Sequence, residues 1–522
     1  MRWRNLRPTI SPLQRPVAFH VLLVPCVLPL ERLRLQVDFL PLSAIRLEWF
    51  APLAGLAAGT WLLLSALTRN ARTSGLAVTL VAAAITVDRS FASLCPAAWQ
   101  SILMALVWVS ACGLGAVLLV RGGDVRVLTL LTNVVAGVLV VSLAVDVVYS
   151  DARYRRERVV TPNLVWGSPP PAAGPDVLIL VLDGYGRADV LRDLYGYDDP
   201  LAAALRRAGC FVAEEAAANY SQTALSLSSS LNMDYLSNLA PGLSSTAYSR
   251  RIPAALIARN RTFAFFRQAG YRIVAFGSEY SMVQFHGADE ERRCWLCGTN
   301  LDYAIYDVSG LPRLFTWLGL PQAWVPHGTR RRGIKWTLDA LRRPNLFSPD
   351  RPTLIVAHVM LPHPPFVLNA DGTARPNALR AGLFDGDHWR WHGGGNREAY
   401  RAGYVAGARF LAREVELIVK SVSASGRRPV NVLVYGDHGP GSGLTWHSAA
   451  GTDLRERMSI LLALRLSRSP ADSPYPAMTP VNAVRSVVQD ALGVRLPPIE
   501  DRSYFSTWTQ PYRYIDVTPR VR

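Results

Sequence analysis

The sequence has few charged residues for its length and lacks the motifs of nucleic-acid-binding proteins. Charged side chains make up 18% of the 522 residues and hydrophobic ones 50%, with a mean hydropathy of +0.14. This composition is too apolar for a protein wholly in water. The net charge of +17 would suit nucleic acid, but no helix-turn-helix, zinc-finger or aromatic RNA-binding motif accompanies it. Many arginines flank apolar stretches, which indicates a membrane protein without a nucleic-acid partner.

No small-residue cleavage site follows the first apolar stretch, so the amino terminus is unlike a cleaved signal peptide. The apolar stretches also lack the charged pairs of a transport path, because Asp88 and Asp146 lie near their ends. Three stretches reach the roughly 20 residues needed to span a bilayer, and two are shorter. The predicted spans are residues 17–30, 47–67, 76–87, 101–120 and 128–149. We therefore predict a transmembrane bundle of about five helices over residues 1–150.

The arginines near these spans predict the orientation of the chain. With five spans, Arg69, Arg72, Arg121 and Arg126 fall on the same side as the amino terminus, in agreement with the positive-inside rule. The basic segment 151–158 opposes this orientation, but charge bias weakens before long translocated domains. We expect the residues after the last span to lie outside.

Four short apolar runs in the second half of the chain are typical of buried strands. They alternate with helical patterns at residues 187–208, 253–269 and 397–422. This alternation predicts an α/β domain with a mostly parallel sheet over residues 175–515, after a proline-rich linker at 151–174. The predicted strands are residues 177–182, 273–276, 354–357 and 432–435.

Carboxylates and imidazoles follow three of these strands. Asp183 follows the first strand, His358 and His363 follow another, and Asp437 and His438 end the last. Ligands bind at the carboxyl ends of strands in open α/β sheets, and this mixture of side chains suits zinc. Each group alone could be an ordinary polar turn. Together they predict a divalent metal site.

A hydroxyl-rich segment, residues 219–231, follows the first strand and helix. Thr223 stands where a helix begins, and a helix amino terminus favours an anion there. A threonine can be a nucleophile if a base or a metal lowers its pKa. The alternative is an ordinary helix cap. The predicted metal ligands favour the interpretation of Thr223 as a nucleophile over that of a helix cap.

The segment Thr223-Ala-Leu-Ser226, its serine-rich helix and Asp437-His438-Gly439 resemble the alkaline phosphatase superfamily. In layout the chain is similar to membrane-anchored phosphoethanolamine transferases and lipoteichoic acid synthases, which have about five spans before a sulfatase-like domain outside the membrane. The resemblance implies a multi-pass protein of a bacterial inner membrane. It also implies transfer of a phosphate-linked group from a lipid or other phosphodiester donor to an envelope glycan or lipid.

The resemblance assigns roles to particular residues. Thr223 would be the nucleophile and a metal ligand, with Asp183, Asp437 and His438 completing the shell of one divalent ion. Zinc is the first choice and manganese the alternative. Three histidines would face the phosphate: His358, His363 and His447. The last two would have acid–base roles. Asp183 replaces the glutamate usual in those transferases, and Asp183-Gly-x-x-Arg187 looks more like the nucleotide pyrophosphatase branch.

True sulfatases carry Cys-x-Pro-Ser-Arg, whose cysteine becomes formylglycine. No cysteine lies between Phe211 and Arg293, which excludes that mechanism here. A sulfatase-like hydrolase or phosphodiesterase on the same fold is the alternative enzyme. A membrane scaffold with a decayed site is the alternative without activity, although none of the expected ligands is missing.

Cys294 and Cys297 form a Cys-x-x-Cys pair, which can be a disulfide, a redox centre or half of a zinc site. The second cysteine pair of a zinc site is lacking, since only Cys210 remains in this domain. We favour a structural disulfide in an oxidising compartment.

Overall fold

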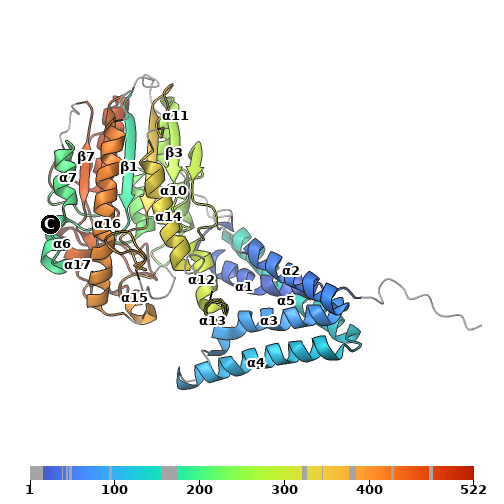
Figure 1. Cartoon of the computed structure of the whole chain (residues 1–522). Coiled ribbons are helices and arrows are strands. Elements are labelled where there is room, and N and C mark those ends of the chain that lie inside the picture. The colour runs from blue at the N-terminus through green and yellow to red at the C-terminus, as the bar shows by residue number, and fades with distance from the viewer. Residues whose placement is uncertain are drawn as a thin grey trace, which may run out of the picture. The chain divides into compact units, whose positions relative to one another are not determined.

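The structure is a computed structural model, and its described residues form two compact units (Figure 1). One unit comprises Met1–Val37, Leu47–Tyr154 and Leu301–Leu320, and the other Asp38–Arg46, Arg155–Asn300 and Pro321–Arg522. This division differs from the predicted boundaries at residues 38–46 and 301–320. Most of the predicted linker lies outside the described residues. The described residues are 16–37, 39–42, 45, 50–92, 97–154, 174–319, 326–343, 345–375, 384–393, 395–424, 428–468 and 474–521.

Five helices make up most of the first unit, and each contains most or all of one predicted span. They are α1 (His20–Val37), α2 (Phe50–Thr68), α3 (Ala71–Ala92), α4 (Ala97–Arg121) and α5 (Arg126–Tyr154). Among the described residues, Met104–Arg121 and Arg126–Arg153 are long and apolar enough to cross a membrane. The apolar stretches of α2 and α3 are shorter. A five-span count therefore stays a prediction.

The outward faces of α4 and α5 are apolar. On α5, Leu131, Val138 and Val145 are each more than half exposed, and they are spaced at seven residues, which is two helical turns. Two helices from the later chain, α12 (Asn300–Val308) and α13 (Leu311–Trp317), belong largely to this unit. Between them, the Gly310 N–H donates to the Ile85 carbonyl of α3 at 2.8 Å.

A seven-stranded sheet forms the centre of the second unit, in the order β2-β7-β6-β1-β5-β3-β4. The four predicted strands are present as β1 (Asp176–Leu182), β3 (Arg272–Phe276), β5 (Thr353–Val359) and β6 (Val430–Gly436). They pair in parallel, with β4 (Glu290–Arg292) parallel at one edge. At the other edge β7 (Leu462–Arg465) is antiparallel to both β6 and β2 (Phe211–Val212). The predicted mostly parallel α/β domain is confirmed.

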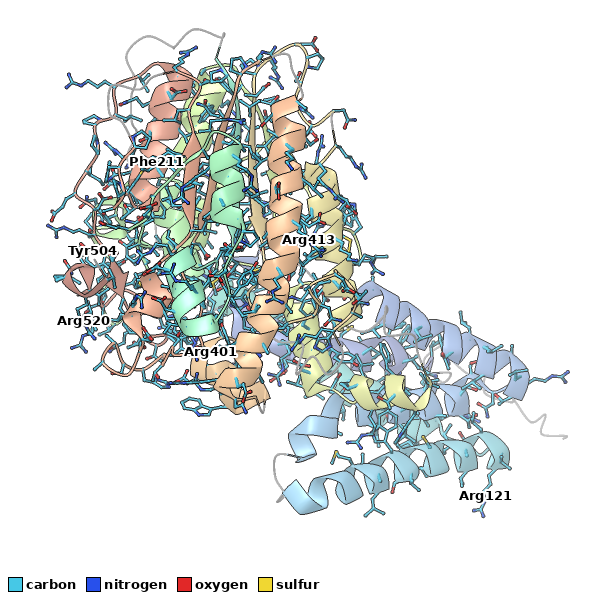
Figure 2. The ribbon with its side chains drawn as sticks, turned by 60° about the vertical axis from the view of Figure 1, so that its left-hand side comes forward. Arg121, Phe211, Arg401, Arg413, Tyr504 and Arg520 are labelled. Carbon is cyan, nitrogen blue, oxygen red and sulfur yellow. A yellow bond between two sulfur atoms is a disulfide. The ribbon has the colours of Figure 1, made fainter. Side chains whose placement is uncertain are left out.

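Side chains of β1 alternate between two cores, one on each face of the sheet. Val177, Ile179 and Val181 join a core with α8 (Thr223–Ser230), α11 (Arg261–Gln268) and α18 (Pro480–Leu492). Leu178, Leu180 and Leu182 join the opposite core with α7 (Leu201–Arg207), α14 (Pro326–Leu341) and α16 (Arg397–Ala424). Every residue of β1 is buried, which explains its continuous apolar run. On α16, Arg413 is exposed, whereas Arg401 is half-buried and donates from Nε to Ser442 Oγ at 3.3 Å (Figure 2).

Two of the three predicted helices are broken. Residues 187–208 form α6 (Ala188–Tyr195) and α7, because Gly196 ends α6 in a left-handed conformation and Pro200 precedes α7. Residues 253–269 form α10 (Arg251–Ala258) and α11, since the Asn260 side chain accepts from the Phe263 N–H and starts a new helix. The third prediction corresponds to α16. The remaining elements are α9 (Leu236–Leu239), α15 (Gly386–Gly393), α17 (Leu454–Met458), β8 (Tyr504–Phe505), β9 (Ile515–Asp516) and α19 (Thr518–Val521).

Asp176, at the amino end of β1, generates a prediction about stability. Burial raises its pKa to about 6, although the Thr353 N–H and Arg428 oppose the shift. Between about pH 4 and pH 6 the unfolded chain has therefore lost a proton that the folded chain retains, so stability falls as pH rises through this window. We expect Asp176→Asn to raise the midpoint of thermal unfolding at pH 8 by about 2 °C and to weaken this pH dependence.

Thermal unfolding of the full chain in detergent at pH 4.5 and pH 8 measures this effect. Asp350→Asn is the control, because Asp350 is exposed. An equal change in both variants would contradict the explanation from burial.

Candidate active site

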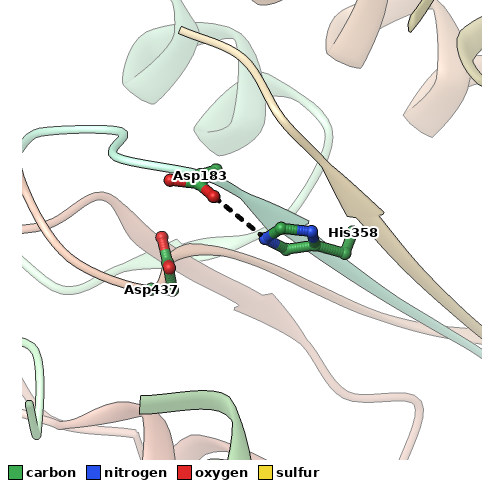
Figure 3. A group of neighbouring side chains, drawn as sticks. All are labelled: Asp183, His358 and Asp437. Carbon is green, nitrogen blue, oxygen red and sulfur yellow. Dashed lines mark ion pairs between the residues drawn. The ribbon is translucent and has the colours of Figure 1, made fainter. Parts of the chain in front are cut away.

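The pairing of three central strands brings two carboxylates and an imidazole to one edge of the sheet. Leu182 of β1 pairs with Gly436 of β6, so the next residues, Asp183 and Asp437, lie side by side. On the other side of β1, Val181 pairs with His358 of β5. One ligand atom from each of Asp183, His358 and Asp437 lies within 4.8 Å of the others (Figure 3). All three side chains are buried.

These three side chains leave polar atoms without hydrogen bonds inside the protein. Both oxygens of Asp183, Oδ2 of Asp437 and Nε2 of His358 are buried and make no hydrogen bond within the described part of the chain. The nearest approach is 3.3 Å, between His358 Nε2 and Asp183 Oδ2. Two adjacent buried carboxylates are costly unless a cation compensates them. The oxygen and nitrogen donors therefore fit a divalent metal ion such as zinc.

His438 connects this cluster to Thr223. His438 Nε2 lies 3.0 Å from Thr223 Oγ1, 3.5 Å from Asp183 Oδ1 and 3.4 Å from Asp437 Oδ2. Its Nδ1 lies 2.9 Å from the Gly439 carbonyl, and a carbonyl can only accept. Nδ1 therefore carries the proton, and Nε2 presents a lone pair to the cluster.

Thr223 begins α8, and its neighbours hold the helix against the carboxylate cluster. The Ser226 hydroxyl donates to the Asp437 carbonyl at 2.7 Å. The Gly184 N–H donates to Asp437 Oδ1 at 3.0 Å, which orients that carboxylate. His358 Nδ1 lies 2.9 Å from Ser278 Oγ, so its Nε2 is the atom left for the cluster. Such supporting bonds are typical of metal sites.

Charges in this cluster oppose the effect of burial on its pKa values. Burial alone would raise the pKa of Asp183, but His363, His358 and His438 lower it below its usual range. Burial lowers the pKa of His438, and Arg457 lowers it further. Three nearby aspartates raise this pKa but do not cancel the decrease. His438 is therefore neutral at neutral pH, as a metal ligand must be.

His363 lies beside the cluster with a buried carboxylate that the sequence analysis did not identify. His363 Nε2 is 4.0 Å from Asp385 Oδ2, and its ring centroid is 6.4 Å from that of His438. Asp385 also contacts Arg457 Nη1 at 2.6 Å and accepts from the Tyr400 hydroxyl at 2.6 Å. Burial would raise the pKa of Asp385, but Arg457, His363 and His438 lower it to about 2.

His447 is not in contact with these groups among the described residues. Its ring lies against Trp391 and His388, with centroids 6.1 and 6.0 Å away, and the side chain is exposed. The connection to the site is indirect: the neighbouring Trp446 donates from Nε1 to the Asp385 carbonyl at 3.0 Å. The structure thus brings His363 next to His438 and Asp385 and leaves His447 at the surface.

Cys294 and Cys297 are joined in a disulfide, with their Cα atoms 5.6 Å apart. This pairing agrees with the disulfide interpretation of the sequence. It leaves Cys210 as a buried free thiol.

No known protein-family model matches this sequence, and no curated protein does either. Several solved structures are similar. The zinc complex of the periplasmic domain of EcEptC from Escherichia coli is 14% identical, with 67% of this chain and 96% of that chain covered and a TM-score of 0.40. The integral membrane lipooligosaccharide phosphoethanolamine transferase A from Neisseria meningitidis is 13% identical. The match covers 91% of this chain and 84% of that chain, with a TM-score of 0.41. BT1596, a 2-O GAG sulfatase, is 13% identical. The match covers 65% of this chain and 74% of that chain, with a TM-score of 0.39.

The unpartnered carboxylates lead to a prediction about metal content. We expect the purified full chain to hold about one divalent ion, as a site with this ligand set would. Asp437→Ala combined with His438→Ala should lose most of it, because two donors are removed. Elemental analysis measures this, and a chelator should lower the unfolding temperature of the wild type but not of the variant.

His447→Ala is the matched control, since this histidine lies outside the cluster. Metal content equal to wild type in the double variant would refute the assignment of the site.

Proposed function

We propose that this protein is a membrane-bound, metal-dependent phosphotransferase that works through a threonine intermediate. The observation that carries the proposal is the 3.0 Å approach of Thr223 Oγ1 to His438 Nε2 beside buried carboxylate oxygens without partners. A hydroxyl becomes a nucleophile when a neighbouring base or metal lowers its pKa. The amino terminus of α8 further favours negative charge on Thr223.

The metal ion would be held by Asp183, Asp437, His438 and Thr223, and the geometry adds His358 as a further candidate ligand. Zinc suits this mixed oxygen and nitrogen set, with manganese as the alternative. When bound, such an ion supplies Lewis-acid stabilisation of the alkoxide and of the phosphoryl oxygens.

In the proposed first step, the Thr223 oxygen, already deprotonated, forms a bond to phosphorus. The bond from phosphorus to the leaving oxygen breaks, and His363 gives that oxygen a proton. In the second step an acceptor hydroxyl passes its proton to His363, attacks phosphorus and releases Thr223. Asp385 supports this role by position, because its Oδ2 lies 4.0 Å from His363 Nε2, on the ring nitrogen that would exchange the proton.

We propose a membrane lipid or lipid-linked phosphodiester as the donor and an envelope glycan or lipid as the acceptor. The apolar exposed faces of α4 and α5 support a site at a membrane, where such donors are found. If water takes the place of the acceptor, the same chemistry gives a phosphodiesterase. If the donor is a sulfate ester, it gives a sulfatase-like hydrolase.

Chain connections support the proposed five-span orientation. The segment directly after α1 packs in the α/β unit, where Leu40 is buried beside Ala224. Gly310, from a segment between β4 and β5, bonds to Ile85 in the last third of α3. The end of α5 leads to β1. In a five-span alternation the carboxyl ends of α1, α3 and α5 share one side of the membrane, which is the outside in the proposed orientation.

This orientation generates a prediction. A reporter that works only outside the cytoplasm, fused after Arg522, should be active. A reporter that works only in the cytoplasm should be inactive at the same position. The reverse pattern would contradict both the orientation and the compartment needed for the Cys294–Cys297 disulfide.

The covalent step generates a second prediction. Thr223→Ala should abolish turnover of a chromogenic phosphodiester and any phosphoryl adduct on the Thr223 peptide, because the attacking oxygen is gone. Mass spectrometry of rapidly quenched protein measures the adduct. Thr223→Ser should retain part of the activity, since it keeps a hydroxyl at the same position.

His363→Ala should keep metal content and lower turnover by about a hundredfold, the usual size of an acid–base contribution. His447→Ala, measured beside it, tests the other histidine that the sequence resemblance assigns. Normal turnover by Thr223→Ala would refute the threonine intermediate. Normal turnover by His363→Ala would refute the acid–base role of His363.

A further inference from the structure

Arg250 differs from the other fully buried arginines in its partners. Three arginines, Arg250, Arg330 and Arg457, are among the largest fully buried side chains. Arg330 Nε lies 3.2 Å from Glu279 Oε1, and Arg457 Nη1 lies 2.6 Å from Asp385 Oδ2. Among the described residues, no carboxylate lies within ion-pair distance of Arg250.

The partners of Arg250 are all neutral. Nη1 donates to the Tyr248 carbonyl at 2.9 Å, and Nη2 donates to Gln222 Oε1 at 3.1 Å and to the Trp508 carbonyl. Its Nε is buried and has no hydrogen-bond partner among the residues that the structure describes. The bonds at Nη1 and Nη2 fix the plane of the guanidinium, so the direction of the free Nε–H is fixed as well.

Aromatic rings compensate part of this buried charge. The guanidinium carbon lies 4.4 Å from the Trp508 ring centroid, 5.2 Å from that of Tyr248 and 5.8 Å from that of Phe39. Cation–π attraction of this kind is weaker than the attraction of an opposite charge. Burying a charge is costly unless an opposite charge is present. A bound anion would supply the missing charge and an acceptor for Nε.

Arg250 is linked to the candidate active site through Gln222. This residue accepts from Nη2, directly precedes Thr223 and is the cap residue of α8. One hydrogen bond and one peptide bond therefore connect the guanidinium to the residue proposed as nucleophile.

We propose that Arg250 forms a subsite for a tetrahedral oxyanion, with its Nε–H donating to a non-bridging oxygen of the substrate. This inference rests on the proposed function for the identity of the oxyanion as a phosphoryl group. A sulfate group has the same shape and also accepts such a bond. A guanidinium suits this task better than an ammonium, because it can keep its neutral partners while Nε binds the anion.

Isothermal titration of the purified, metal-loaded full chain with inorganic phosphate, and in parallel with inorganic sulfate, tests the subsite. We expect Arg250→Met to weaken phosphate binding by about tenfold or more, the usual size of a hydrogen bond to a charged group. Arg250→Lys keeps the charge but not the Nε–H, and should also bind more weakly than wild type. Metal content and the unfolding temperature are measured for each variant.

Arg485→Met is the matched control. Arg485 also donates only to carbonyls, those of Pro497 and Met233, and has no contact with Gln222 among the described residues. Its substitution should leave oxyanion binding unchanged. If Arg250→Met fails to fold, the comparison of Arg250→Lys with wild type carries the test.

The outcomes separate this inference from the proposed function. Phosphate binding by folded Arg250→Met or Arg250→Lys equal to wild type overturns the subsite, even if Thr223→Ala abolishes turnover. Wild type that binds neither oxyanion overturns it too. Weakened binding in the Arg250 variants supports the subsite even if Thr223→Ala turns over normally, in which case the proposed function fails. Tighter binding of sulfate than phosphate supports the subsite and favours the sulfatase-like alternative.

Discussion

The electrostatic repulsion between Asp183 and Asp437 is the constraint around which the site is built. Parallel pairing of β1 with β6 sets the two carboxylates side by side, because Leu182 pairs with Gly436. The two cores on either face of the sheet hold this register, since a shift by one residue would turn β1 side chains to the wrong core. Packing far from the site thus keeps two negative charges together and buried.

Imidazoles around the carboxylates are oriented by bonds on the side away from the cluster. His438 and His358 each use Nδ1 for a bond away from the cluster, to Gly439 and Ser278, and leave Nε2 facing it. The next carboxylate, Asp385, has its own cation in Arg457 at 2.6 Å. Asp183 and Asp437 have no arginine or lysine partner among the described residues. A cation bound at these two side chains would compensate their buried negative charge.

The buried strands could be predicted from sequence because parallel strands covered on both faces are continuous apolar runs, and polar residues directly after them must lie at the sheet edge. That reasoning identified Asp183, Asp437 and His438. It could not identify Asp385 or Arg250, because neither follows a buried strand. Asp385 precedes a short helix and Arg250 caps another, and their importance depends on partners more than 25 residues away.

The broken helices escaped prediction for a different reason. A hydrophobic period continues across Asn260, but its side-chain cap starts a new helix.

The α/β unit also includes a segment that sequence alone assigned to the membrane region. Phe39 and Leu40 follow α1 directly, yet Leu40 is fully buried with Ala224, Ala254 and Met282. Ala224 is the residue after Thr223, and Phe39 lies against the ring of Tyr248 with centroids 4.5 Å apart. An apolar side chain in such a place excludes water from the helix that carries Thr223. The connection between α1 and α2 is thus part of the packing behind Thr223, and a chain cut at residue 175 would leave that surface uncovered.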